Sequence, residues 1–372
     1  MKFLQSLRLN KKLLRELDYV TIIIAICIVT FGCINIYSAK YKNGTGNYYL
    51  EKQIASMILS LIIVYFLLVF DYMVIENYAV IIYWAGIVLL IIGRFIGHAT
   101  NGSNSWINMG PINMQPSEFA KIGMIIMIAK RLDEMEGKIN NPKNMLELIF
   151  YAAVPMILIV IQPDMGMTMV SFFIVLGIFF CVGLDKKIII GGLTSILILV
   201  AGAWNTPIFQ NYWKGRLTSF LNPEKDPSGS GLQLIQSKLA IGSGGIFGRG
   251  FGKGVQFNSI PEHHTDFIFA VLSEEWGFVG ALVLLLLYCI LIYRLIKIAK
   301  ASKDIFGTVL CVGFVSNLLF SIMQNIGMNI GIMPITGITL PFMSYGGSSL
   351  LTSFIALGLV LNVGMRRNKI NF

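Results

Sequence analysis

The chain has 372 residues, of which 55% are apolar and only 13% are charged, and its formal net charge is +10. Soluble globular domains carry roughly 25% charged residues, so this composition excludes a soluble globular protein. Several apolar runs approach the ~20 residues that cross a bilayer as a helix. We therefore expect an all-α polytopic membrane protein, built as a single domain over residues 1–372.

The hydropathy pattern predicts ten membrane-spanning helices. Most Lys and Arg residues, including every short basic cluster, fall on the side of the N-terminus, so both termini are expected in the cytoplasm. No cleavable signal peptide is expected, because no small-residue cleavage site follows the basic N-terminal stretch. The expected spans are residues 19–38, 54–70, 78–96, 117–129, 146–161, 165–183, 188–204, 266–293, 306–330 and 340–364.

This topology leaves three outer segments, of which the longest covers residues 205–265. Apolar residues recur at helical spacing in 208–220 and 232–241, which predicts two short amphipathic helices at the outer interface. We therefore expect function to face outward. The positive charge is explained by topology, so no nucleic-acid partner is expected. The five cysteines lie inside apolar segments without a close pair, so no disulfide or zinc site is expected.

Glu118 and Lys121 place an acid and a base three residues apart near the outer start of the fourth span. On one interpretation Ser117 caps the helix, Glu118 complements its positive end and Lys121 is the partner of Glu118. On the other, Lys121 faces a wet cavity, because a charge near a span centre costs roughly 2.5 to 3.5 kcal/mol. A lysine in a cavity suits an anionic ligand, and both interpretations stay open.

Three further positions carry weaker signals. Asp164 opens a span and is best explained as an N-cap. Lys52 precedes the second span, where it either snorkels to the interface or joins other cations at an anion site. The glycine run 242–256 has dinucleotide-like spacing, but no strand precedes it, so the nucleotide interpretation is rejected. Its Arg249 either offers a cation to phosphate or lies in a solvated loop.

The stretch 257–277 combines histidines and carboxylates with the start of a long apolar run. Asp266 lies where the polar loop becomes an apolar helix, so a helix cap and a general base are both open for it. His263 and His264 are adjacent and point in different directions, which argues against a metal site. Glu274 follows eight residues later, about 80° around the helix, so it or its neighbour is expected to face the substrate in the same cavity.

Four segments of the chain together resemble the SEDS family (shape, elongation, division and sporulation), and its elongation branch more than its division branch. The resemblance covers nearly the whole chain, and its motifs are specific. The matching segments are WINMGPINMQPSEFAK, IQPDMG, GKGVQFNSIPEHHTDFIFAVLSEEWG and NIGIMPITGITLPFMSYGGSS.

The resemblance implies a peptidoglycan glycosyltransferase that polymerises lipid II during cell elongation. It implies a bacterial plasma membrane location with an outward-facing active site, and a class B penicillin-binding protein as transpeptidase partner. Asp266 matches the essential aspartate of the family. Glu118, Lys121 and Asp164 match polar positions of its central cavity, and Lys52 matches a basic site.

The chemistry implied is the attack of a sugar 4-hydroxyl on an anomeric carbon that carries undecaprenyl pyrophosphate. Asp266 would act as the general base, in an inverting reaction. Lys52 and Lys121, joined by Lys238, Arg249 or a divalent cation such as Mg²⁺ or Mn²⁺, would neutralise the departing pyrophosphate.

Two other functions would use similar residues. A flippase or transporter of the lipid-linked precursor also needs polar groups inside spans, but its cavity should open alternately to both sides. A non-catalytic scaffold for a penicillin-binding protein would need no base at Asp266.

Overall fold

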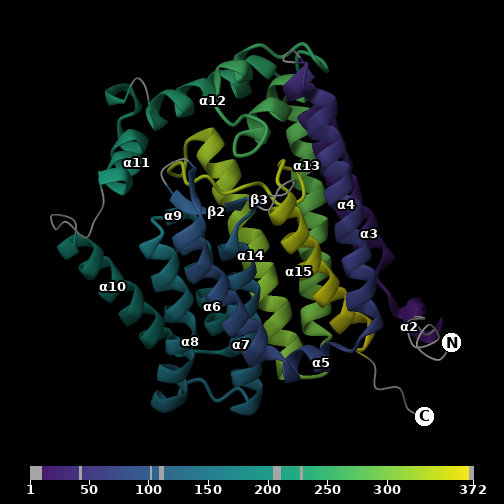
Figure 1. Cartoon of the computed structure of the whole chain (residues 1–372), viewed down its shortest axis with the longest axis vertical. Helices are drawn as coiled ribbons and strands as arrows, with labels where there is room; N and C mark the ends of the chain where they lie inside the picture. The colour runs from purple at the N-terminus through teal and green to yellow at the C-terminus, as the bar shows by residue number, and fades with distance from the viewer. Residues whose placement is uncertain are drawn as a thin grey trace.

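Helices occupy all ten positions at which the hydropathy pattern predicts a span (Figure 1). The structure is a computed structural model that describes residues 11–41, 44–100, 103–108, 113–203, 211–226 and 229–367. Its α-helices are α2 Lys11–Glu16, α3 Tyr19–Tyr41, α4 Gly46–Val69, α5 Tyr72–Asn77, α6 Ala79–Ile96, α7 Pro116–Glu134, α8 Pro142–Ile161, α9 Met165–Val182, α10 Lys186–Ala203, α11 Asn211–Leu221, α12 Ser230–Gly244, α13 Ile268–Lys300, α14 Ile305–Ile330 and α15 Gly347–Met365.

Within the described residues, eight of these helices are long and apolar enough to cross a membrane: α3, α4, α6, α8, α9, α13, α14 and α15. The helix α7 differs because it is packed inside the bundle, where α6, α8 and α14 contact it. All of its residues from Ala120 to Ala129 are buried. Its polar side chains therefore face other helices rather than lipid, which is how charged residues are accommodated in a membrane protein.

The long outer segment contains both predicted amphipathic helices. They are α11 and α12, which extend across the upper end of the bundle in Figure 1, opposite α2 and the end of α15. Two short 3₁₀ turns, Pro223–Lys225 and Gln256–Ser259, follow α11 and α12 respectively. The segment is thus folded over the bundle.

The outer segment after α6 forms a small sheet, which the sequence did not predict. Its strands are β1 His98–Thr100, β2 Ser103–Asn108 and β3 Asn113–Met114, in the order β1-β2-β3 with antiparallel pairing. β1 and β3 are only three and two residues long, and β2 (SNSWIN) lacks the alternation of polar and apolar residues that identifies a strand in a sequence. The fold class remains all-α apart from this element.

Several helix boundaries differ from the prediction, and two of the differences affect the candidate site. The last helix begins at Gly347 instead of residue 340, because residues 331–346 form an irregular segment that includes Pro334 and Pro341. Proline lacks the N–H that a helix interior needs. The helix α13 begins at Ile268 and is interrupted at Gly277, where φ is 65° and ψ is −162°. These irregular segments position the candidate site.

Candidate active site

Asp266 lies in the turn just before α13, and its backbone is fixed by hydrogen bonds. Its N–H donates to the carbonyl of Glu262 at 3.2 Å. Its own carbonyl accepts from Nδ2 of Asn325 at 2.8 Å and of Asn329 at 3.2 Å, both on α14. The N-cap of α13 is Phe267, and no side chain caps it. The helix-cap interpretation of Asp266 is therefore wrong, and its carboxyl group is left for another role.

The carboxyl group of Asp266 lies against the irregular segment 331–346. A Cβ atom at Gly337 would lie 3.5 Å from Oδ2 of Asp266. Asn325 holds the two segments together, because its Nδ2 also donates to the carbonyl of Ile338 at 2.7 Å. Gly337 has a φ of 77°, which favours glycine, so the backbone at this point passes close to the acid.

The charge state of Asp266 is set by its surroundings. Burial and the nearby Glu262 raise the pKa of Asp266 to about 7. The guanidinium of Arg216 acts in the opposite direction, and Asp164 adds a further upward contribution. A carboxyl group with a pKa near neutrality can both accept and release a proton at physiological pH.

Asp164 caps α9, as the sequence predicts, and belongs to the same electrostatic cluster. Its carboxylate accepts from the backbone N–H of Met167 at 3.0 Å and from Nε2 of Gln115 at 2.9 Å. Burial raises the pKa of Asp164, the two hydrogen bonds and Arg216 oppose that rise, and Glu118 adds to it. Asp164 and Asp266, about one hundred residues apart in the chain, therefore interact with the same guanidinium.

Arg216 is a cation of this cluster that sequence reasoning missed. It lies on α11, and its Nη1 donates to the carbonyl of Ile335 at 3.0 Å, which joins the outer helix to the segment 331–346. The only sequence signal is that an arginine occurs on an amphipathic helix of the outer loop. Nothing in its spacing connects it with Asp164 or Asp266.

Glu118 and Lys121 form a buried ion pair on α7 with a separation of 3.1 Å, as their spacing suggested. Oγ1 of Thr352 on α15 donates to Glu118 at 2.8 Å. Ser117 does not cap α7, whose N-cap is Gln115, and its hydroxyl has no partner among the described residues. Glu118 already neutralises Lys121, so Lys121 contributes less positive charge to an anionic ligand than an unpaired lysine would.

Lys52 lies on α4 beside a chain of contacts that leads to the Asp266 turn. Its Nζ is 4.4 Å from the centre of the Tyr48 ring. The next residue, Gln53, donates to the carbonyl of Ser344 at 3.1 Å, and the Ser344 hydroxyl donates to the carbonyl of Thr265 at 2.6 Å. Lys52 is therefore at the edge of the site.

Lys238 reaches the site from the opposite direction. It is an exposed residue of α12 whose side chain packs over Gly331, where a Cβ atom would overlap it. The adjacent Ser237 donates to the carbonyl of Asn329 at 2.9 Å, and Asn329 in turn contacts Asp266. This places α12 beside the turn that carries the candidate base.

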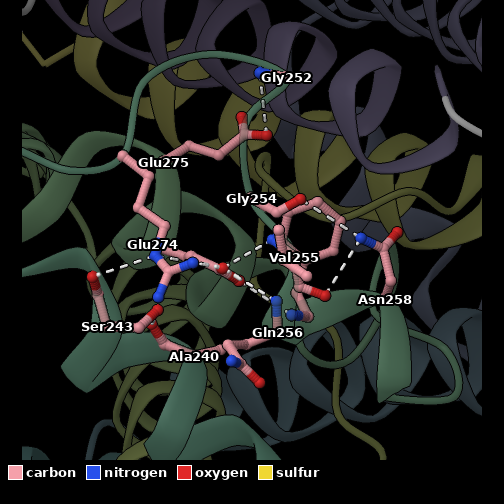
Figure 2. Close-up of polar contacts among 11 residues, drawn as sticks. Ala240, Ser243, Gly252, Gly254, Val255, Gln256, Asn258, Glu274 and Glu275 are labelled. Carbon is pink, nitrogen blue, oxygen red and sulfur yellow. Dashed lines mark hydrogen bonds and ion pairs between the residues drawn. The ribbon is translucent and has the colours of Figure 1, made fainter.

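Glu274 differs from its expected role, because its carboxylate is fully buried beneath the glycine run (Figure 2). It accepts hydrogen bonds from the backbone N–H groups of Val255 at 2.7 Å, Gln256 at 2.9 Å and Phe257 at 2.9 Å. Nε of Arg249 lies 3.8 Å from the same carboxylate. Glu274 and Arg249 thus hold a loop together instead of facing a shared substrate cavity.

The neighbouring Glu275 also anchors this loop. Its Oε1 accepts from the Ser38 hydroxyl at 2.5 Å. It also accepts from the N–H of Gly252 at 3.2 Å (Figure 2). The sequence placed one of the two glutamates in the site because helical geometry was assumed throughout. Asp266 lies in the turn before α13, so helical geometry does not relate it to the glutamates, and the glycine run folds back over both carboxylates.

The two histidines serve as structural supports. The ring nitrogens of His263 contact the carbonyls of Ile260 at 2.8 Å and Ala39 at 3.1 Å. The His264 ring packs edge-on against Tyr49, with 4.9 Å between centroids. Burial lowers the pKa of both histidines, that of His264 to about 3. No group of three metal-binding side chains occurs within the described part of the chain.

The sequence of the whole bundle matches a known family. A family model described as "Cell cycle protein", covering FtsW, RodA and SpoVE, matches residues 18–369. The chain belongs to this family. It is the SEDS family that the four segments resemble, and the site above lies within the matched region.

Relatives of this SEDS-family chain are named for sporulation and for peptidoglycan glycosyltransferase activity. It is 38% identical to the stage V sporulation protein E of Bacillus subtilis (strain 168), with 93% of this chain and 96% of the relative covered. It is 34% identical to the peptidoglycan glycosyltransferase MrdB of Escherichia coli (strain K12), with 96% and 95% covered.

Solved structures show the same fold. One chain comes from a peptidoglycan synthase complex described for the coordination of polymerization and crosslinking. It matches with a TM-score of 0.84 at 31% identity, covering 95% of this chain and 99% of the other. The rod shape determining protein RodA of Thermus thermophilus matches with a TM-score of 0.72 at 30% identity, covering 95% and 98%. This SEDS-family chain is a multi-pass bacterial membrane protein.

Proposed function

We propose that the chain is a peptidoglycan glycosyltransferase that polymerises lipid II into glycan strands during cell elongation, with Asp266 as the general base. The observation that carries this proposal is the state of Asp266. Its backbone is fixed by two asparagines of α14, its carboxyl group makes no helix cap, and its pKa is about 7. These are the properties required of a base that works near neutral pH.

In the reaction, the Asp266 carboxylate takes the proton of the acceptor sugar 4-hydroxyl as the oxygen attacks the anomeric carbon of the donor. The new glycosidic bond forms while the bond to the undecaprenyl pyrophosphate breaks, and the pyrophosphate leaves with the bonding electron pair. Attack from the face opposite the leaving group converts an α-linked donor into a β-linked polymer. General base catalysis of this kind contributes roughly 10² to 10⁴ in rate.

The leaving pyrophosphate needs positive charge, and Arg216 is the best placed group to supply it. It acts electrostatically on both Asp164 and Asp266. Lys52 and Lys238 approach the same turn from α4 and α12 and would contact more distant parts of the substrate. Lys121 and Arg249 are paired with Glu118 and Glu274, so their roles are to hold the site in shape.

A divalent cation, Mg²⁺ or Mn²⁺, fits the carboxylates of this site. Mg²⁺ is commonly held by one or two carboxylates together with substrate phosphates, without a complete protein cage. Asp164 would hold it, since its carboxylate lies within electrostatic range of both Asp266 and Arg216. Such a cation would supply further charge to the departing pyrophosphate.

The chain would work in the bacterial plasma membrane together with a transpeptidase partner. The active site would face the outside of the bacterial plasma membrane, because the basic segments lie at the opposite end of the bundle. A class B penicillin-binding protein would crosslink the strands. The match to a chain from a peptidoglycan synthase complex supports this partner.

The test uses purified full-length protein with lipid II and measures glycan polymer. The wild type should make uncrosslinked polymer, and Asp266→Asn should make none while keeping a normal melting temperature. Glu224→Gln, which changes an exposed carboxylate of the same outer segment, should leave activity unchanged. Polymer of normal yield from Asp266→Asn would refute the assigned base.

The same experiment separates the two rival functions. Precursor that crosses the membrane of a vesicle without forming polymer would favour a flippase. Activity that appears only with a penicillin-binding protein, and that persists in Asp266→Asn, would favour a scaffold. The present geometry favours the polymerase, because Asp164, Arg216 and Asp266 gather at the end of the bundle where α9 and α13 begin.

A further inference from the structure

A second polar site lies at the opposite end of the bundle, near the two termini. An open cavity of about 310 Å³ lies where α2 ends, α3 begins and α13 and α15 end. Its lining includes four basic residues, Arg15, Arg294, Lys297 and Arg367. This cavity is separate from the candidate glycosyltransferase site, which lies at the N-terminal ends of α9 and α13.

Two of the four cations are neutralised by acids of the same cavity. Arg294 makes a two-point contact with Asp18, with Nε and Nη2 each 2.8 Å from a carboxylate oxygen. Nη2 of Arg367 lies 3.2 Å from Oε2 of Glu16. Both pairs lie in the wall of the cavity: the first joins α13 to the start of α3, and the second joins the end of α15 to α2.

The other two cations, Arg15 and Lys297, have no ion-pair partner within the described part of the chain. Both are exposed, and both line the cavity. With the other two cations paired to acids, Arg15 and Lys297 leave a net charge of about +2 at the cavity. An anion is the ligand that this arrangement favours.

The cavity is continuous with a lipid-facing surface. Lys297 follows Ile290 and Tyr293 on one face of α13, at helical spacing, and these two side chains are 45% and 67% exposed. Across the cavity, Val20 and Ile23 of α3 are 45% and 57% exposed. Val20 also lines the cavity, and α3 packs against α13, so the cavity borders on exposed apolar side chains.

We propose that this cavity binds the headgroup of an anionic phospholipid, with its phosphate between Arg15 and Lys297 and its acyl chains on Val20, Ile23, Ile290 and Tyr293. The basic end of the molecule, to which the cavity belongs, faces the cytoplasmic leaflet by the distribution of charge. Basic pockets between helices on that side bind anionic headgroups. A soluble anion would use the cations but not the apolar surface beside them.

The experiment titrates detergent-purified full-length protein with phosphatidylglycerol or phosphatidylcholine and counts bound lipid by native mass spectrometry. The wild type should retain phosphatidylglycerol in preference to phosphatidylcholine. Arg15→Ala with Lys297→Ala should weaken the phosphatidylglycerol affinity about 30-fold, since each basic residue near an anionic surface contributes about fivefold.

The matched control is Lys186→Ala with Lys187→Ala, which removes two exposed cations from the start of α10 at the same end of the bundle. It should leave phosphatidylglycerol binding within about twofold of the wild type. Arg15→Lys with Lys297→Arg should retain binding, which shows that charge and not folding is responsible. Equal binding of both lipids, equal losses in the two alanine pairs, or displacement of the lipid by inorganic phosphate would each overturn the proposal.

Discussion

At the scale of single residues, the surroundings of Asp266 determine the pKa of its carboxyl group. Burial and Glu262 raise its pKa to about 7, whereas an aspartate in water titrates at about 4. Because only the ionised form can accept a proton, the initial rate of polymerisation should rise through pH 7 and level off above about pH 8. A rate profile from pH 5.5 to 8.5 measures this, and a constant rate between pH 6 and 8 would contradict it.

The same raised pKa affects stability. The folded protein holds the Asp266 proton up to about pH 7, while the unfolded chain releases it near pH 3.8. The contribution of Asp266 to stability is therefore fully present below pH 3.8 and is lost as the pH rises through 7. Asp266→Asn removes this dependence, so its melting temperature relative to the wild type should be higher at pH 8 than at pH 5. Melting curves of both proteins at these two pH values test this, and an equal difference at both would argue against the assignment.

Arg216 should affect both the rate of polymerisation and the ionisation of Asp266. Arg216→Gln removes positive charge from the leaving group and from Asp266, so we expect about a 100-fold lower rate and a rate profile shifted to higher pH. Arg216→Lys should retain part of the rate because it keeps the charge. Lys214→Gln on the same helix is the control, and an equal loss there would mean that only the total charge of α11 matters. Rate profiles of the three variants provide the measurement.

At the scale of elements, the glycine run 242–256 is joined by backbone hydrogen bonds to the point where α13 is interrupted. Where α13 is interrupted at Gly277, the carbonyls of Glu274 and Glu275 accept from the N–H groups of Arg249 and Gly250 at 2.9 and 3.0 Å. The N–H of Phe278 donates to the loop in return, at 2.9 Å. The loop therefore satisfies backbone groups that a break would otherwise leave without partners.

Gly277→Ala should disrupt this junction. A Cβ atom at Gly277 would overlap the backbone of Gly248 and Ile246, and the φ of 65° disfavours a side chain. We expect the free energy of unfolding to fall by about 2 kcal/mol or more. Gly242→Ala on α12 is the matched control, since its Cβ would meet nothing within 4 Å, and it should be neutral or slightly stabilising. The melting temperatures of the two variants are measured in the same detergent. Similar losses in both would show that the junction at Gly277 is no more sensitive to a side chain than the middle of α12.

Sequence reasoning succeeded where a single segment determines the outcome. Hydropathy predicted the positions of the long helices, and the cap at Asp164 and the Glu118–Lys121 pair followed from local spacing. It failed where segments distant in sequence meet. Arg216 could not be connected with Asp266 before α11 was placed over the bundle. Glu274 was misplaced because Asp266 precedes α13 and does not share its helical geometry, and because the glycine run folds over the Glu274 carboxylate.

At the scale of the whole molecule, the two ends of the bundle carry different chemistry. The end covered by α11 and α12 holds the acids Asp164 and Asp266 with Arg216. The other end holds the basic cavity and most of the Lys and Arg residues. Between them, exposed apolar side chains cover the outward faces of the long helices. This distribution fits a protein that spans a membrane, and from the excess of basic residues at one end we expect that end in the cytoplasm.

Cysteine labelling in intact cells tests this orientation. Glu224→Cys introduces an exposed thiol in the outer segment, and Lys138→Cys introduces one between α7 and α8 at the basic end. A membrane-impermeant maleimide should label position 224 in intact cells and position 138 only after the membrane is opened. The five native cysteines all lie inside helices, so the unsubstituted chain provides the background. Labelling of position 138 in intact cells would show that the orientation is the reverse of the expected one. The polymerase site would then face the cytoplasm, away from the growing wall.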